Sequence, residues 1–184
     1  MGEHASRVQS ALRERLASAV EHLVWHVEYD LDGTPVDVAG VSDSTLVLVE
    51  LEWRRADPVD NTATLFRHLA DGVLRASTDR TVVVVQLFTA YYDLVRGGVS
   101  SKRQNAEFVG DRIATAVPHV SYHGVSLPLS PPRADGDLPD DWRDAVETAV
   151  GSVSDALASR EQAHDGREQT HGGREQREET GERS

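Results

Sequence analysis

The sequence predicts an α/β protein in which a mixed β-sheet is flanked by helices in three layers. Segments with an apolar residue at every third or fourth position alternate with segments of alternating or continuous apolar residues. The first pattern is typical of amphipathic helices and the second of strands. Their order is helix, three strands, helix, strand, helix, strand, helix, which favours a sheet covered by helices. We expect this domain to span residues 6–158.

The N-terminal elements are predicted to be a helix, a hairpin and a third strand. The buried face of the helix would be Val8, Leu12, Leu16, Val20 and Leu23. The strands are expected at residues 27–31, 35–41 and 45–53. Asp32-Gly33 lies between the first two strands, and this dipeptide is typical of a two-residue hairpin turn. Asp57-Pro58 ends the third strand.

The later elements are predicted to alternate between helix and strand. Helices are expected at residues 61–75 and 101–117 and from 140 to about 158, and strands at 81–88 and 120–127. Four consecutive valines indicate that the first of these strands is central and buried. Ser101 and Gln104 have the spacing of a capping box. The buried face of that helix would be Phe108, Val109, Ile113 and Val117. The last helix, capped by Asp140, would bury Trp142, Val146, Val150, Val153 and Leu157.

The last segment, residues 159–184, differs from the rest in composition. Arg-Glu-Gln recurs there at 160, 167 and 174. Glycines interrupt this repeat, and its a and d positions carry no apolar residue, which disfavours a coiled coil. We predict a disordered, low-complexity tail without a catalytic role.

The chain is strongly acidic. Its formal net charge is -12, and Lys102 is the only lysine among 19 basic residues. This balance is typical of halophilic proteins, whose carboxylates stay hydrated in concentrated salt. An acidic protein repels DNA at ordinary salt, but at about 1 M salt the Debye length is only about 3 Å. The net charge therefore does not exclude DNA as a partner.

Composition disfavours several other classes of protein. Cysteine is absent from the sequence, which excludes disulfides and thiolate metal sites. No apolar run approaches the roughly 20 residues that span a bilayer, and the N-terminus lacks a signal-peptide pattern. We expect a cytoplasmic protein without a membrane partner.

Three carboxylates on neighbouring strands are the main candidates for a functional site. Asp37 lies on the second strand, and Glu50-Leu51-Glu52 ends the third. Because side chains alternate along a strand, Glu50 and Glu52 should share one face. Burying unpaired carboxylates is costly, and a metal or an arginine is the usual compensation. Mg²⁺ takes oxygen ligands, so the cluster predicts a magnesium site. In the alternative interpretation, the glutamates of a half-exposed strand face water.

These residues resemble the PD-(D/E)xK nuclease superfamily, whose core is a helix, a three-stranded meander, a helix and a strand. Pro35 and Asp37 on the second strand and Val-Glu-Leu-Glu-Trp on the third carry the resemblance. With Asn61 and the helix that bears Arg67, the pattern looks like the BglII and BamHI restriction endonucleases over residues 6–127. It implies a restriction-endonuclease-like core and a metal-dependent DNA endonuclease of a restriction or defence system. It also implies Mg²⁺ or Mn²⁺ as cofactor, double-stranded DNA as substrate and a homodimer.

The resemblance implies individual roles as well. Asp37 and Glu50 would bind the metal together with the backbone carbonyl of Leu51. Glu52 stands where most of the superfamily has lysine, and it would accept a proton or bind a second metal.

Further residues would support the metal or contact DNA. A glutamate of the first helix often supports the metal-bound water, and Glu21 and Glu14 are the candidates here. The residues expected to contact DNA are Arg54, Arg55, Asn61, Arg67, Lys102 and Arg103. The basic residues among them also suit an ordinary solvated surface.

Other polar residues and other functions stay open on the sequence alone. His22 and His26 have the i, i+4 spacing of zinc ligands, and His119 and His123 flank the start of a strand. All four also suit structural or surface roles. A non-catalytic binding or assembly module could keep the nuclease fold without turnover, and a structural interaction protein would have no site. Magnesium binding separates the endonuclease from both.

Overall fold

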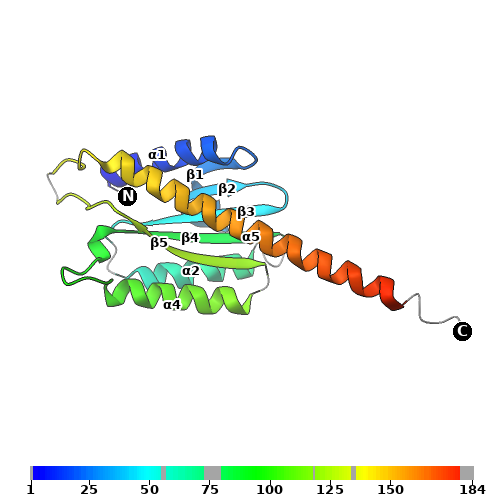
Figure 1. Cartoon of the computed structure of the whole chain (residues 1–184). Helices are drawn as coiled ribbons and strands as arrows, with labels where there is room; N and C mark the ends of the chain where they lie inside the picture. The colour runs from blue at the N-terminus through cyan, green and yellow to red at the C-terminus, as the bar shows by residue number, and fades with distance from the viewer. Residues whose placement is uncertain (1, 55–56, 73–79, 118, 134–135, 179–184) are drawn as a thin grey trace, which may run out of the picture.

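Five strands form one mixed sheet at the centre of the computed structural model (Figure 1), in the spatial order β1-β2-β3-β4-β5. They are β1 (Val24–Leu31), β2 (Thr34–Val41), β3 (Thr45–Glu52), β4 (Thr81–Thr89) and β5 (Val120–Leu127). The first three strands are an antiparallel meander, and β4 and β5 continue the sheet parallel to β3. The predicted α/β class with a mixed sheet is confirmed.

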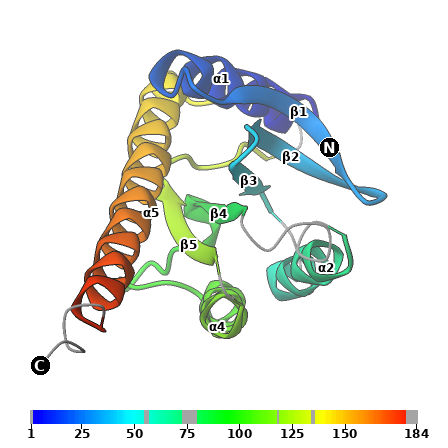
Figure 2. The same cartoon turned by 90° about the vertical axis from the view of Figure 1, so that its right-hand side faces the viewer.

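Helices α1 and α5 cover one face of this sheet, and α2 and α4 cover the other (Figure 2). Their bounds are α1 (Glu3–Ala19), α2 (Pro58–Asp71), α4 (Ser101–Ala116) and α5 (Trp142–Glu178), and a short 3-10 helix, η1, spans Ala90–Tyr92. The structure describes residues 2–54, 57–72, 80–117, 119–133 and 136–178, with side chains up to residue 160. This arrangement is consistent with a three-layer core.

Apolar side chains fill both faces of the central strands. The core under α1 and α5 includes Val38, Val47, Val49, Val83, Val85 and Leu87 of the sheet. The core under α2 and α4 includes Val36, Ala39, Leu46, Leu48, Val82 and Val84. Strands apolar on both faces are typical of sheets covered on both sides. The residues predicted to face inward from the last helix are all buried, namely Trp142, Val146, Val150, Val153 and Leu157.

The turn between β1 and β2 has the predicted form. Asp32 and Gly33 both have positive φ values, 52° and 84°. Two consecutive positive φ values are what a type I′ turn requires, and aspartate and glycine tolerate them well. This two-residue turn fixes the register of the hairpin.

The boundaries of α1, α2 and α4 differ from the prediction, and α2 spans Pro58–Asp71 instead of residues 61–75. α1 ends at Ala19, so Val20 and Leu23 lie beyond the helix, although both are buried as expected. The N-cap of α4 is Ser100, one residue before the predicted Ser101. These shifts of the helix ends have little effect on packing, because the apolar periodicity, rather than the cap, determines which face of a helix is buried.

The predicted buried face of α4 was wrong at Phe108, which is 60% exposed. α4 instead turns Arg103, Ala106 and Gly110 toward the sheet. A Cβ atom at Gly110 would overlap the ring of Tyr122 on β5. Glycine therefore lets a large ring of the sheet occupy the space that the apolar pattern assigned to a helix side chain.

The backbone of α5 continues as a helix to Glu178, past the edge of the sheet (Figure 1). Side chains beyond residue 160, and residues 179–184 altogether, lie outside the described part of the chain. Disorder of residues 159–184 therefore stays a prediction. Among the residues that are described, no helix is long and apolar enough to cross a membrane.

Candidate active site

A kink in the β1–β2 hairpin sets the position of Asp37. Residues two apart on a strand share a face, yet Val36 packs in the core under α2 and α4, and Val38 in the core under α1 and α5. The alternation therefore breaks at Asp37. The hairpin register places Glu28 opposite, and its φ of 49° is strained for a residue other than glycine. Such strain persists only where surrounding contacts hold it.

The Asp37 carboxylate accepts a hydrogen bond from the backbone of β3, as a main-chain carbonyl does in regular strand pairing. The regular pairing of β2 with β3 starts one residue later, at Val38. Asp37 Oδ2 accepts a hydrogen bond from the Leu51 N–H at 2.6 Å. Gln9 Nε2 donates to the Asp37 carbonyl oxygen at 2.6 Å and to Glu28 Oε1 at 2.8 Å. These contacts hold Asp37, which is only 4% exposed, against the end of β3.

Glu50 and Glu52 both reach the face under α2 and α4. Asn61 Nδ2 of α2 lies 3.2 Å from Glu50 Oε2 and 2.8 Å from Glu52 Oε1, so one amide bridges the two carboxylates. Gln86 Nε2 of β4 donates to the same Glu52 oxygen at 2.9 Å. Glu50 is 2% and Glu52 0% exposed. The predicted shared face is confirmed, and burial excludes the alternative in which these glutamates face water.

A cleft of about 370 Å³ opens beside Asp37. It is lined by Gly2, Ala5, Glu28, Pro35, Asp37, Leu51, Trp53 and Arg54. Asp37 and Leu51 therefore border a space that a ligand can enter, whereas Glu50 and Glu52 are not part of its lining. A larger cleft of about 450 Å³ lies between α1 and α5 around Trp142, and its lining includes none of the three carboxylates.

The three predicted carboxylates lie near one end of β3, but they do not form a closed ligand set. Asp37 reaches the peptide that joins Glu50 to Leu51, and Asn61 bridges Glu50 and Glu52. Within the described ranges, no group of three or more His, Asp or Glu side chains is arranged to hold a metal. Mg²⁺ is usually held by one or two carboxylates and keeps several waters. Asp37, Glu50 and the Leu51 carbonyl offer hard oxygen donors of that kind.

The structure does not bring Glu21 to this cluster. α1 ends at Ala19, and Glu21 is exposed in the connection to β1. Glu28 stands beside Asp37 instead, since both side chains line the cleft. The sequence contains the signal for this, because a two-residue hairpin turn places Glu28 opposite Asp37.

The residues predicted to contact DNA divide into exposed and internal ones. Arg54 is exposed at the cleft, where its guanidinium lies 5.6 Å from the centre of the Tyr91 ring. Arg67 on α2 and Lys102 on α4 are exposed as well. Arg55 lies outside the described residues. Asn61, by contrast, is engaged with the two glutamates.

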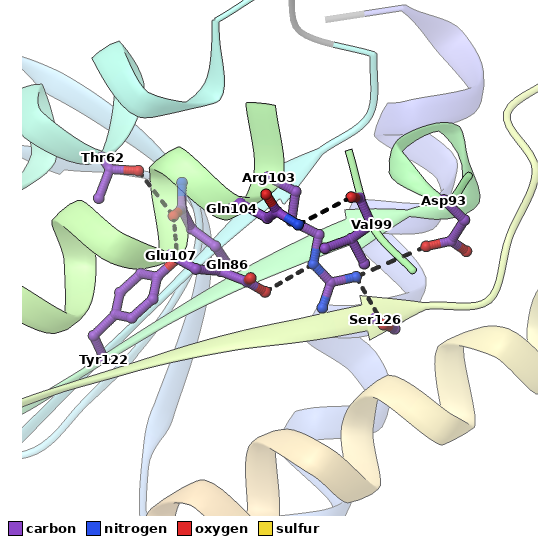
Figure 3. Close-up of polar contacts among 9 residues, drawn as sticks. All are labelled: Thr62, Gln86, Asp93, Val99, Arg103, Gln104, Glu107, Tyr122 and Ser126. Carbon is purple, nitrogen blue, oxygen red and sulfur yellow. Dashed lines mark hydrogen bonds and ion pairs between the residues drawn. The ribbon is translucent and has the colours of Figure 1, made fainter. Parts of the chain in front are cut away.

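Arg103 is an interior residue, with a side chain 8% exposed. Its guanidinium pairs with Glu107 at 2.7 Å and donates to Ser126 at 2.8 Å (Figure 3). It also lies 4.0 Å from Asp93 and 5.0 Å from the centre of the Phe88 ring. These contacts hold the start of α4 against the sheet, so the Arg103 charge is balanced inside the protein.

In the described part of the chain, the four histidines considered above as possible metal ligands do not come together as a metal site. His22 is exposed, and the ring of His26 packs 6.0 Å from that of Tyr29. His119 has a φ of 63° just before β5. Burial lowers the pKa of His123 on β5 below its ordinary value.

Sequence reasoning missed the residues that hold the carboxylates in place. Gln9 steadies the kink at Asp37, and Gln86 binds Glu52. Gln86 directly follows the four valines of β4, and a polar residue in such a strand is a signal of a buried polar contact. Comparisons of the chain with protein-family models, curated proteins and solved structures found no match.

Proposed function

We propose that the protein is a metal-dependent DNA endonuclease of the PD-(D/E)xK type, with a restriction-endonuclease-like core. The observation that carries the proposal is the burial of Asp37, Glu50 and Glu52 at one end of β3, beside an open cleft. The order of the elements supports it, because an antiparallel meander is followed by a helix and a parallel fourth strand. That is the order of the superfamily core.

Three buried carboxylates at one end of β3 are oxygen ligands of the kind that divalent cations prefer. The Asn61 and Gln86 amides and the Leu51 N–H orient these carboxylates. Buried charges are generally paired or coordinate a metal, because an uncompensated charge in the interior is expensive. A divalent cation, Mg²⁺ or Mn²⁺, would be the metal partner of these carboxylates.

The residues of the cluster have distinct roles in this proposal. Asp37, Glu50 and the backbone carbonyl of Leu51 would hold the cation. When bound, such a cation makes its water more acidic and neutralises charge on the phosphate in the transition state. Glu52 would accept the proton of the attacking water or bind a second cation.

Double-stranded DNA is the proposed substrate, bound by a homodimer. Arg54 at the cleft and the exposed Lys102 and Arg67 would contact phosphates. The net charge of -12 opposes DNA binding at ordinary ionic strength. We therefore infer that the enzyme works in concentrated salt, where only local contacts act.

Plasmid cleavage in multimolar KCl, with and without MgCl₂, tests this function. We expect wild type to cut only with the metal, and Glu50→Gln to abolish cleavage because it removes a ligand while keeping the side-chain shape. Glu147→Gln is the matched control, since Glu147 is a half-exposed residue of α5 paired with Arg15. If wild type neither binds magnesium in a calorimetric titration nor cuts DNA at any salt concentration where it is folded, the proposal is wrong.

One observation favours a second function, a non-catalytic nuclease-fold module. Glu52 occupies the position where most of the superfamily has lysine, and its Oε1 already accepts hydrogen bonds from two amides. A carboxylate held in this way suits a structural role in a module that binds DNA without turnover. Such a module would bind DNA in the presence of EDTA, whereas the nuclease would need magnesium to cut.

A further inference from the structure

A chain of hydrogen bonds links three more elements to Glu52. Gln86 lies on β4 and is fully buried. Its Nε2 donates to Glu52 Oε1 at 2.9 Å. Its Oε1 accepts from the Thr62 hydroxyl at 2.9 Å and from the Tyr122 hydroxyl at 2.6 Å (Figure 3). Side chains from α2, β4 and β5 thus converge on one glutamate of β3.

The neighbours of Gln86 determine which way its amide points. If the amide were turned over, its oxygen would face Glu52 Oε1 at hydrogen-bond distance, and two acceptors would oppose each other. Burial raises the pKa of Tyr122, and the nearby carboxylates of Glu107 and Asp111 raise it further. The Tyr122 hydroxyl therefore keeps its proton at neutral pH and acts as a donor to the amide oxygen.

Tyr122 holds the amide more firmly than Thr62 does. The Thr62 hydroxyl has a single proton and two acceptors at 2.9 Å, Gln86 Oε1 and the Pro58 carbonyl. The Tyr122 hydroxyl makes the shorter contact with Gln86. Removing the Tyr122 hydroxyl should therefore loosen the amide, even though Thr62 stays in place.

Packing of the Tyr122 ring fixes where its hydroxyl lies. The ring packs against α4 at Gly110, where a Cβ atom would overlap it. On its other side the ring lies 6.3 Å from the ring of Phe66 on α2. The hydroxyl is thus carried by a ring held between two helices, which makes it a rigid anchor for the Gln86 amide.

We propose that Gln86 is a positioning residue, anchored by Tyr122, that holds the Glu52 carboxylate in the orientation needed for catalysis. This inference rests on the proposed nuclease function. Loss of an outer hydrogen-bond partner at a metal site typically lowers affinity or activity by about 10- to 100-fold. Because Gln86 and Tyr122 act through Glu52 and not on DNA, kcat should fall while KM for DNA stays the same.

Two variants separate this role from a structural one. Tyr122→Phe removes only the hydroxyl, and Gln86→Met removes the amide while keeping a side chain of similar length. Ser126→Ala is the control, because it removes a hydroxyl that contacts Arg103 in the same region but is not bonded to Gln86. Cleavage of a DNA duplex is measured in multimolar KCl and MgCl₂, together with the melting temperature of each variant.

We expect kcat to fall about 10-fold or more in Tyr122→Phe and Gln86→Met, with unchanged KM, and to stay unchanged in Ser126→Ala. NMR should show slowly exchanging side-chain amide protons of Gln86 in wild type and faster exchange in Tyr122→Phe. If Gln86→Met does not fold, the kcat of the Tyr122→Phe variant tests the inference. Wild-type kcat in a folded Tyr122→Phe variant overturns the inference and leaves the nuclease function standing. A wild type that neither binds Mg²⁺ nor cuts overturns the nuclease function and, with it, this role.

Discussion

The sheet face under α2 and α4 has an apolar half and a polar half built on the same strands. Leu46 and Leu48 of β3 lie in the apolar half. Glu50 and Glu52 follow Leu48 by two and four residues on the same strand and lie in the polar half. β3 and β4 keep one parallel register across both halves, so the backbone does not distinguish them. Only the side chains change. Buried polar clusters at otherwise apolar positions are characteristic of functional sites, where stability is given up for chemistry.

The two halves are also held together differently. The apolar half needs only close packing, whereas the polar half depends on hydrogen bonds from neighbouring elements, with Asn61 donating from α2 and Gln86 from β4. Hydrogen bonds contribute little net stability when made but are expensive when one partner is removed. Substitutions in the two halves should therefore differ in both magnitude and kind.

The largest effect is expected in the apolar half. Leu48→Ala should lower the free energy of unfolding by about 2–5 kcal/mol, because it removes buried methyl groups and leaves a cavity. Glu50→Gln should leave stability nearly unchanged or raise it, since it removes one of several neighbouring buried charges. Urea denaturation in multimolar KCl without magnesium measures both. An equal loss in Glu50→Gln would show that the polar half is structural.

A smaller effect is expected where the polar half meets α4. Gly110→Ala should lower the free energy of unfolding by about 1–3 kcal/mol, because the new methyl group must displace the Tyr122 ring. Gly151→Ala is the matched control, since Gly151 is an exposed residue of α5 with no atom near its Cβ position. It should stabilise the protein by about 0.8–1 kcal/mol through helix propensity. Destabilisation by both variants would contradict the close approach of Tyr122 to α4.

The features of the fold and the site that depend on local sequence patterns could be predicted from the sequence. The apolar periodicity identified the helices, and the alternation in Glu50-Leu51-Glu52 put two carboxylates on one face. The kink at Glu28 was not predictable from a strand pattern, because a positive φ at glutamate depends on contacts with another element. The burial predicted for Phe108 was wrong because α4 turns Arg103, Ala106 and Gly110 toward the sheet instead.

The partners of the carboxylates depend on relations between distant segments. Gln86 meets Glu52 because β3 and β4 are parallel, with Glu50 level with Gln86. Tyr122 reaches Gln86 from a third strand, 36 residues further along the chain. Polar contacts of this kind join residues far apart in the sequence, so a pattern within one segment does not identify them.

The smallest effect concerns a buried polar group outside the polar half, the imidazole of His123. His123 follows Tyr122 on β5 and so points to the opposite face, toward α5. Among the described residues, its buried Nε2 has no hydrogen-bond partner. Burial lowers the pKa of His123, Asp111 raises it and Arg160 lowers it, so the net shift is downward. Unfolded His123 therefore binds a proton at a higher pH than folded His123 does.

The sign of the pH dependence follows from this difference. Above about pH 6.5, the ordinary histidine pKa, His123 is neutral in both states and adds no pH dependence. As the pH falls below that value, the unfolded state takes up the proton first, so stability decreases until the lowered pKa of the folded state is reached. His123→Asn should weaken this decrease below about pH 6.5, as measured by urea denaturation in multimolar KCl. His22→Asn, at an exposed position, should keep the wild-type dependence. A His123→Asn variant with the full wild-type decrease would show that His123 is not held neutral by burial.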